Sequence, residues 1–203
     1  ACEVFGEGIF ISLSSKEIDN WAKKNKEALS KRLSAMQNTY EKENLDFLPS
    51  PNAKFVLLHT LSHLLIRQLS FDCGYAGSSL QERIYCDESN MAGILIYTAD
   101  ADSEGSLGGL VRQGEPDQLI PTVISCLQKS TCCSSDPICK ELQGQGMRGL
   151  NKAACHACTL LSETSCIAHN TILDRMLLIG DDNKGEFGFF NTIIKNYIEA
   201  NNS

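Results

Sequence analysis

The chain has 203 residues, of which 42% are hydrophobic and 21% are charged. This composition excludes disordered, collagen-like and coiled-coil proteins and is enough for one sizeable domain. The longest apolar run, Phe55 to Leu69, is interrupted by His59, His63 and Arg67. It is too short to span a bilayer, so we expect no membrane partner.

The formal net charge is −7, from 18 basic and 25 acidic residues. A protein that grips duplex DNA by itself usually carries a basic stripe, because phosphate contacts dominate its affinity. The densest basic stretch, residues 23–32, is more typical of a solvated helix face. We therefore expect this chain alone to bind DNA weakly.

The first fifty residues contain one strand signal and one helix signal. Residues 7–13 alternate in the manner of a strand, and Ser14 and Glu17 have the spacing of a capping box. A helix should therefore run from this box to about Gln37. Its apolar face would consist of Ile18, Trp21, Ala22, Leu29, Leu33 and Met36.

The middle of the chain contains the strongest core signals. Ser50-Pro51 is a helix start, and the apolar run 55–69 predicts a central buried helix that ends near Gly74. Residues 82–86 predict a short strand and residues 92–97 a stronger one. Further helices are expected at 116–128, 170–179 and 187–200. The predicted fold class is α+β, a small mixed sheet packed by helices around the central helix, with a cysteine-rich zinc-binding module.

Ten cysteines are present, and six of them lie between positions 132 and 166. Clusters at such short spacings favour a metal site over a disulfide framework. A Cys-x2-Cys pair such as Cys155 and Cys158 allows two thiolates to reach one tetrahedral ion, and four thiolates would make the zinc site closed and structural. The candidate ligands are Cys133, Cys139, Cys155 and Cys158, with Cys166 as the first substitute.

The cysteine spacing is also compatible with other ligand sets. Cys132 could replace Cys133, and His156 or His169 could complete a site of three cysteines and one histidine. The cluster could also consist of buried reduced thiols, of disulfides, or of a redox Cys-x2-Cys pair. The redox pair normally opens a helix after a strand, which this segment does not predict.

Two histidines, His59 and His63, lie at positions i and i+4 on one face of the central helix. The spacing resembles that of a zinc protease, but Thr60 stands where the general-base glutamate is required, so no metalloprotease is predicted. We expect both imidazoles to be hydrogen-bonded in or beside the core. A second metal site and a polar contact to the strand-loop region are the alternatives.

The segment from Asp100 to Gly109 is rich in glycine and carboxylates and follows a predicted strand. It matches neither a P-loop nor an EF-hand loop. We expect a tight loop that packs on its neighbours or contacts a nucleic acid or a partner protein. Its carboxylates also permit an enzyme hypothesis, a metal-dependent nuclease or hydrolase that uses His59, His63, Asp100, Asp102 and Glu104.

Several segments, taken together and in this order, resemble a known family. The chain is similar to the C-terminal part of the DrmB-like proteins of the DISARM anti-phage defence system. That part is related to the zinc-binding domain of MrfA-type DNA-repair helicases. The resemblance covers roughly residues 3 to 180 and is carried by Glu7-Gly-Ile-Phe10, Leu58-His-Thr-Leu-Ser-His63, Tyr97 through Val111, Cys133-Ser-Ser-Asp-Pro-Ile-Cys139, Ala154-Cys-His-Ala-Cys158, Glu163-Thr-Ser-Cys166 to Asn170, and Leu173-Asp-Arg175.

The resemblance implies a bacterial, cytoplasmic protein with a structural Zn²⁺ bound by cysteines. It also implies a superfamily 2 helicase as partner, in cis or in trans, while the chain itself lacks a Walker A lysine motif and a DEAH-type box. We expect residues 1–50 to be a strand and helix left from a longer protein. Residues 51–180 would be the helicase-associated zinc-binding domain, with its cysteine module at 132–166, and residues 181–203 a C-terminal helix.

The favoured hypothesis is a non-catalytic, zinc-stabilised accessory domain that helps a helicase-containing complex engage DNA. The working surface is expected at the Asp100–Gly109 loop and at an exposed face near His59. A pure protein-interaction scaffold is a further hypothesis, in which the partner alone contacts DNA.

Overall fold

A computed structural model describes residues 6–86, 90–98, 109–180 and 187–201. Three antiparallel strands form one sheet in the order β1-β3-β2, with β1 at Gly8–Ser12, β2 at Leu80–Tyr85 and β3 at Gly93–Thr98. Across the described residues the sheet is combined with eight α-helices, so the α+β fold class is confirmed.

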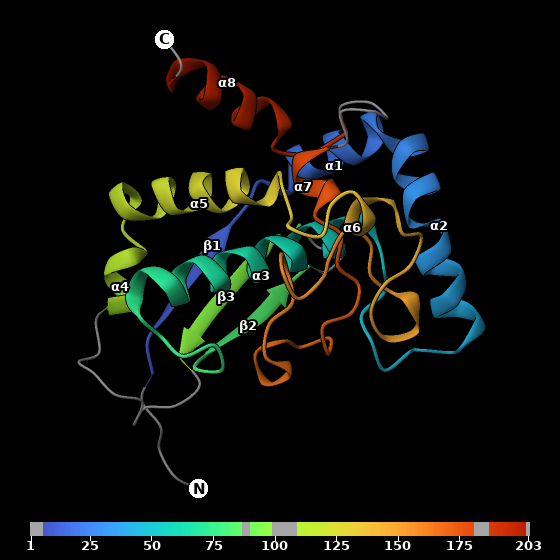
Figure 1. The fold of residues 1–203 in the computed structure, drawn as a ribbon, viewed down its shortest axis with the longest axis horizontal. Coiled ribbons are helices and arrows are strands. Elements are labelled where there is room, and N and C mark those ends of the chain that lie inside the picture. The colour runs from blue at the N-terminus through green and yellow to red at the C-terminus, as the bar shows by residue number, and fades with distance from the viewer. Residues whose placement is uncertain (1–5, 87–89, 99–108, 181–186, 202–203) are drawn as a thin grey trace, which may run out of the picture.

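Helix α3, Ala53–Cys73, is the centre of the molecule (Figure 1). The Asn52 side chain caps its first turn by accepting a hydrogen bond from the Phe55 N–H, and Gly74 ends it in the left-handed conformation. The helix packs against β2 and β3 on one side and against α5, Pro116–Ser130, on another. Because it is covered on several sides, its sequence is apolar nearly all round, as predicted.

The sheet face under α3 is apolar because alternate residues of each strand point toward the helix. Ile94 and Ile96 of β3 have no exposed surface, and neither does Leu80 of β2. The register pairs Glu82 with Ile96, so the same alternation places a carboxylate in this buried layer. Glu82 is only 1% exposed, which makes it the exception in an apolar face.

The single helix expected from the capping box to Gln37 is two helices, α1 at Ser15–Lys24 and α2 at Lys26–Lys42. The Ser14 cap is confirmed, since its side chain accepts a hydrogen bond from the Glu17 N–H. The break falls at Asn25, whose side-chain amide and backbone N–H both donate to the Trp21 carbonyl. Asparagine competes with the helical backbone in this way, which ends α1.

The prediction of a helix over residues 170–179 is mostly wrong. Only α7, Met176–Ile179, is helical there. Asn170 and Ile172 have positive φ, and the Ile172 N–H donates to the Leu150 carbonyl. This stretch therefore pairs with the segment around residue 151 and turns back on itself.

The remaining elements complete the shell around α3. Helix α4, Gly109–Gln113, packs against β1, and α8, Asn191–Asn201, packs on α5 and α7. The cysteine module, residues 132–166, lies between α3 and α2 in Figure 1 and contains only short helices: α6 at Ile138–Glu141, η1 at Met147–Gly149 and η2 at Glu163–Ser165. No helix among the described residues has the length and apolarity that a membrane span requires.

Candidate metal centre

Four sulfur atoms converge in the cysteine module, from Cys133, Cys139, Cys155 and Cys158. The Sγ atoms of Cys133 and Cys155 are 3.6 Å apart, those of Cys155 and Cys158 are 3.7 Å apart, and those of Cys139 and Cys158 are 3.8 Å apart. A tetrahedral zinc ion with bonds of about 2.3 Å to sulfur places its ligands about 3.8 Å apart. Disulfide bonds are about 2.05 Å long, so these sulfurs are not joined in pairs.

Local turns bring donors to these sulfurs. The backbone N–H of Ser135 donates to Cys133 Sγ over 3.4 Å, and the backbone N–H of Cys155 donates to Cys158 Sγ over the same distance. The Thr159 hydroxyl lies 3.2 Å from Cys158 Sγ. Hydrogen bonds of this kind stabilise negative charge on sulfur, which is the form that binds a metal.

The electrostatics of the four thiols favour a cation among them. Burial and the neighbouring Cys158 raise the pKa of Cys139, and burial also raises the pKa of Cys158. At Cys155 burial acts in the same direction, but the Cys158 backbone and the Cys133 thiol donate hydrogen bonds that lower its pKa to about 7. Four thiolates at this spacing repel one another, and a divalent cation removes that repulsion.

Arg175 connects the module to the core and has no exposed side-chain surface. Its guanidinium donates to the Ser130 carbonyl over 2.7 Å, to the Ala153 carbonyl over 3.0 Å, and to Asp136 Oδ1 over 2.5 Å. Asp136 Oδ2 in turn accepts the Cys133 N–H over 2.9 Å. Although burial opposes it, the bond from Arg175 lowers the pKa of Asp136, so the pair remains ionised. In the sequence, Arg175 stands out only as part of the family-like segment Leu173-Asp-Arg175, which assigns it no role at the metal site.

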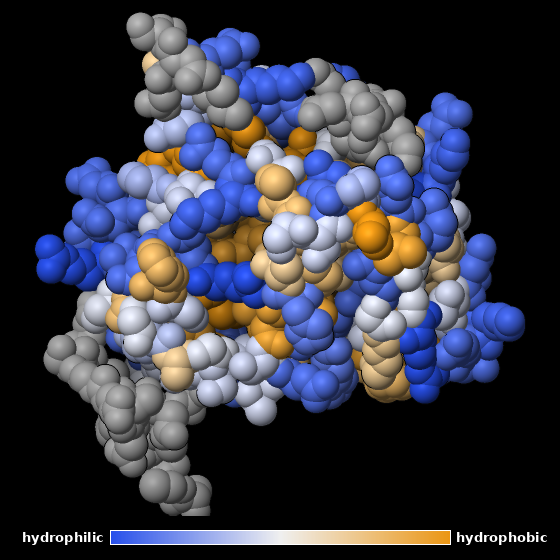
Figure 2. Space-filling model, in the orientation of Figure 1, coloured by the Kyte–Doolittle hydropathy of each residue, from blue (hydrophilic) through white to orange (hydrophobic). Residues whose placement is uncertain are grey.

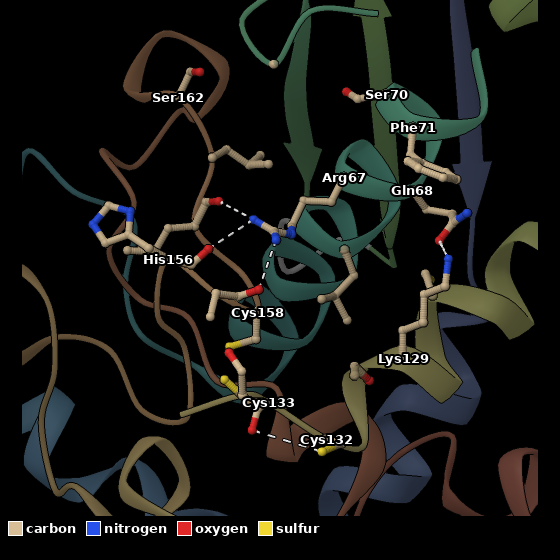
Figure 3. A pocket seen from close by; sticks show the side chains of 18 residues that line it. Arg67, Gln68, Ser70, Phe71, Lys129, Cys132, Cys133, His156, Cys158 and Ser162 are labelled. Atoms are coloured by element: carbon tan, nitrogen blue, oxygen red, sulfur yellow. Dashed lines mark hydrogen bonds between the residues drawn. The ribbon is translucent and has the colours of Figure 1, made fainter. Parts of the chain in front are cut away.

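Arg67 of α3 binds the second cysteine turn (Figure 3). Its guanidinium donates to the carbonyls of His156, Ala157 and Leu160 over 3.0 to 3.3 Å. The turn that presents Cys155 and Cys158 is therefore fixed to the central helix. An arginine suits this task because its planar fork carries several donors in fixed directions.

A cleft of about 760 Å³ lies beside this turn, between α3, α5 and the cysteine module. Figure 2 shows apolar side chains at the floor of a hollow in the middle of this face. Arg67, Lys129 and Phe71, which is 81% exposed, line the cleft (Figure 3), and among the described residues no carboxylate does. The Lys129 ammonium lies 5.5 Å from the centre of the Phe71 ring.

The other candidate ligands lie elsewhere. Cys132 is exposed, as are His156 and His169, and none of the three belongs to the group of sulfurs. The structure does not bring Cys166 to the four cysteines either. Its Sγ lies 3.2 Å from His59 Nε2, in a second group of buried side chains.

The two histidines are buried and hydrogen-bonded in the core, as the sequence analysis expects. His59 and His63 have no exposed surface, and each Nδ1 faces a backbone carbonyl. The prediction of an exposed working surface near His59 is therefore wrong, because the sheet covers α3 there. Both Nε2 atoms point toward Glu82, which the sequence patterns did not connect with the histidines.

The side chains of this second group also shift one another's pKa values. Burial opposes protonation of His59, but the charge of Glu82 and a hydrogen bond with Cys166 raise its pKa to about 10. Burial favours the neutral forms of Glu82 and Cys166, yet the two histidines hold the pKa of Glu82 well below its usual range and lower the pKa of Cys166 to about 6. The surroundings thus stabilise negative charge on both acids.

The enzyme hypothesis would need the histidine pair to meet Asp100, Asp102 and Glu104. These three residues lie outside the described part of the chain. The two imidazoles are closed off from solvent, so neither offers a position that a substrate or an attacking water could reach.

Comparison with known proteins agrees with the geometry. The family described as MrfA Zn-binding domain matches residues 61–159. The chain is also 43% identical, over 183 residues, to the DISARM protein DrmB of Bacillus paralicheniformis, an alignment that covers 88% of this chain and 32% of that protein. The chain thus spans about a third of the length of this relative.

The family match includes all four converging cysteines, and their sulfurs have the spacing that zinc requires. Zinc binding is therefore confirmed as a property of the domain. The chain carries an MrfA-type zinc-binding domain and is a relative of the DISARM protein DrmB.

Proposed function

We propose that the chain is a non-catalytic, zinc-stabilised accessory domain of an anti-phage defence complex. In this proposal Cys133, Cys139, Cys155 and Cys158 hold one Zn²⁺, and residues 51–180 form the domain that works with a superfamily 2 helicase. The domain would help the complex engage DNA in the bacterial cytoplasm, where a reducing environment keeps thiolates available to the metal.

One observation carries the non-catalytic assignment: the four sulfurs fill every position of a tetrahedral ion. A catalytic zinc keeps one position for water or substrate, whereas a site closed by four thiolates is structural. The zinc would stabilise the fold of a segment that has little regular secondary structure of its own. The relation to DrmB supports a role in defence.

Charge supports an indirect role in DNA binding. A zinc ion with four thiolates carries about −2, which Arg67 and Lys129 offset at the cleft. The cleft is then close to neutral, in a chain whose net charge is −7. Without a surplus of cations the domain gains little from counterion release, so its partner must supply most of the phosphate contacts.

We place the contact surface at the cleft, because Phe71 offers an exposed aromatic ring beside two cations and no carboxylate from the part of the chain that the structure describes lines the surface. Aromatic rings of this kind stack on unpaired bases and fill pockets in partner proteins. Both uses are compatible with a domain that helps a helicase hold a strand.

The test is a binding titration of labelled single-stranded and duplex DNA with the chain, with the helicase, and with both together. We expect little binding by the chain alone at physiological salt, and tighter binding by the helicase when the chain is present. Phe71→Ala should weaken the binding of the complex about tenfold. The matched control is Phe47→Ala, which removes a ring that is 68% exposed but does not line the cleft.

Two outcomes would contradict this function. Submicromolar, salt-insensitive duplex binding by the chain alone would make it a DNA-binding module in its own right. Mg²⁺- or Mn²⁺-dependent DNA cleavage that Asp102→Ala abolishes would make it a nuclease.

A pull-down separates DNA engagement from a pure scaffold role. If the helicase co-purifies with the chain after nuclease treatment and the chain leaves the DNA affinity of the helicase unchanged, the chain is a scaffold. If the affinity rises with the chain present, the proposed role in DNA engagement is supported.

A further inference from the structure

A second group of metal-ligating side chains lies beneath α3, apart from the four cysteines. It brings together His59 and His63 of α3, Glu82 of β2, and Cys166, which follows η2. One ligand atom of each lies within 4.8 Å of the others. All four residues are buried, with exposed fractions between 0% and 7%.

The imidazoles are oriented as metal ligands are. Nδ1 of His59 lies 3.3 Å from the Ile172 carbonyl, and Nδ1 of His63 lies 3.1 Å from the Thr159 carbonyl. A carbonyl only accepts, so each Nδ1 carries the proton. With a metal bound in place of the second proton, each ring is neutral and directs the lone pair of Nε2 toward the centre of the group. A second hydrogen bond of this type fixes the tautomer of most metal-bound histidines.

The distances fit one small cation. His59 Nε2 lies 3.0 Å from Glu82 Oε1 and 3.2 Å from Cys166 Sγ, and His63 Nε2 lies 3.4 Å from Glu82 Oε1. A tetrahedral zinc ion would set nitrogen and oxygen about 3.3 Å apart and nitrogen and sulfur about 3.5 Å apart. The group therefore needs to move by only a few tenths of an ångström to bind such an ion.

Two buried atoms in the group, His63 Nε2 and Glu82 Oε2, make no hydrogen bond of good geometry among the described residues, although His63 Nε2 lies 3.4 Å from Glu82 Oε1. An unsatisfied buried polar atom costs about 1–3 kcal/mol, so native cores rarely contain two side by side. A metal ion in the group would accept the lone pair of His63 Nε2 and neutralise the charge of the Glu82 carboxylate, which reduces this cost.

The remaining donors support negative charge at the two acidic ligands. The backbone N–H groups of Ala168 and Asn170 donate to Cys166 Sγ over 3.4 and 3.2 Å, and the Ile167 N–H donates to Glu82 Oε1 over 3.4 Å. A thiolate and a carboxylate together carry about −2, which one divalent cation neutralises while both histidines stay neutral. Without the cation, the same balance would require two buried imidazolium ions beside each other.

We propose that His59, His63, Glu82 and Cys166 form a second closed site for a divalent transition metal ion. The mixed imidazole, thiolate and carboxylate donors favour Zn²⁺. With four protein ligands and no access for solvent, the ion has a structural role. It links three segments that are distant in the sequence: the central helix, the sheet and the last part of the cysteine module.

The first test needs no variant. The chain is purified without chelator, desalted after incubation with zinc, and analysed for all first-row transition metals together with zinc-edge X-ray absorption. We expect about two ions per chain, and a nitrogen and oxygen shell at about 2.0–2.1 Å in addition to sulfur at about 2.3 Å. A single zinc with a sulfur shell alone would overturn the second site, while leaving the four-thiolate site intact.

Variants then locate the second ion. Cys166→Ser and Glu82→Gln should each reduce the metal content from about two ions to about one and leave the sulfur shell of the first site. Cys132→Ser, which removes an exposed thiol outside both groups, is the control and should retain both ions. A Cys166→Ser protein that keeps two ions would also overturn the proposal. If that variant does not fold, the absorption spectrum of the unaltered chain still decides.

Discussion

Helix α3 and the cysteine module lie side by side, and the side chains they bury differ in kind. Helix α3 buries leucines, a valine and an isoleucine over five turns, among them Val56, Leu58, Leu65 and Ile66 with no exposed surface. The module has short helical turns, and its buried positions include Cys133 and Cys139. Apart from the polar group around His59 and His63, apolar burial is the main source of stability in the first region. The second depends on coordination and on buried polar contacts.

Several polar contacts of the module come from outside it. Arg175 and Arg67 each donate to backbone carbonyls in or next to the module. The two regions should therefore respond differently to substitution. Changes at the four-sulfur site should affect the module first, and changes at the apolar positions of α3 should affect stability without affecting that site.

The largest expected effect is that of Cys139→Ser. Removing one thiolate opens the four-sulfur site, and structural zinc contributes on the order of 10 kcal/mol to folding in small zinc domains. We expect loss of one zinc and unfolding of the module, measured as metal content and as protease cleavage within residues 132–166. Cys132→Ser is the matched control, and loss of zinc from that variant instead would mean that Cys132 is the ligand.

Arg175→Met should produce the next largest effect. The substitution leaves two buried carbonyls without their donor and removes the ion pair of Asp136, whose side chain is 16% exposed and also lies 3.8 Å from Lys140. Breaking a fully buried pair costs about 3–5 kcal/mol, and the loss here should be smaller. Since Asp136 accepts the Cys133 N–H, zinc should also be released more readily to a competing chelator. Stability from chemical denaturation and zinc transfer to a chromogenic chelator measure the two effects. Unchanged zinc release would separate the arginine from the metal site.

Leu65→Ala tests the other region. Leu65 has no exposed surface, and truncation of such a leucine costs about 2–5 kcal/mol through lost burial and a residual cavity. We expect a lower denaturation midpoint with full metal content. Val111→Ala, at a position that is 53% exposed, should change the midpoint little. If Leu65→Ala also lost zinc, the two regions would form one cooperative unit and the contrast between them would fail.

The smallest effect is expected at the surface of the module. Arg148 forms an ion pair with Glu43 over 2.6 Å, but both side chains are more than a third exposed. Exposed pairs contribute about 0–1 kcal/mol to stability, so Arg148→Met should change the free energy of unfolding very little. In high salt, which screens the pair, the change should disappear. A loss of stability as large as that caused by Arg175→Met would mean that any arginine contact to the module is essential.

The sequence predicts well those parts of the fold whose signals are local, that is, contained within a single helix, strand or cap. The apolar run of α3, the alternation of β1 and the Ser14 cap are local signals, and the structure confirms each. The converging cysteines were also predictable, because short spacings between thiols leave few alternatives to a metal.

The parts that were missed depend on contacts between distant residues. The break at Asn25 and the turn at Asn170 both arise where a side chain or a distant carbonyl competes with the helical backbone. The grouping of His59 with Glu82 and Cys166 requires knowledge of the β2 register and of the packing of η2 on β2. One signal was available, since alternation in β2 places Glu82 on the same face as Leu80.

The most direct test of this account is amide hydrogen exchange of Cys139→Ser compared with the unaltered chain. The account predicts that amides around Cys133 to Thr159 exchange at least about tenfold faster in the variant, while those of α3 and β3 keep their protection. Equal loss of protection in α3 and β3 would contradict the claim that apolar packing stabilises one region and zinc the other. Full protection of the module without its zinc would contradict it as well.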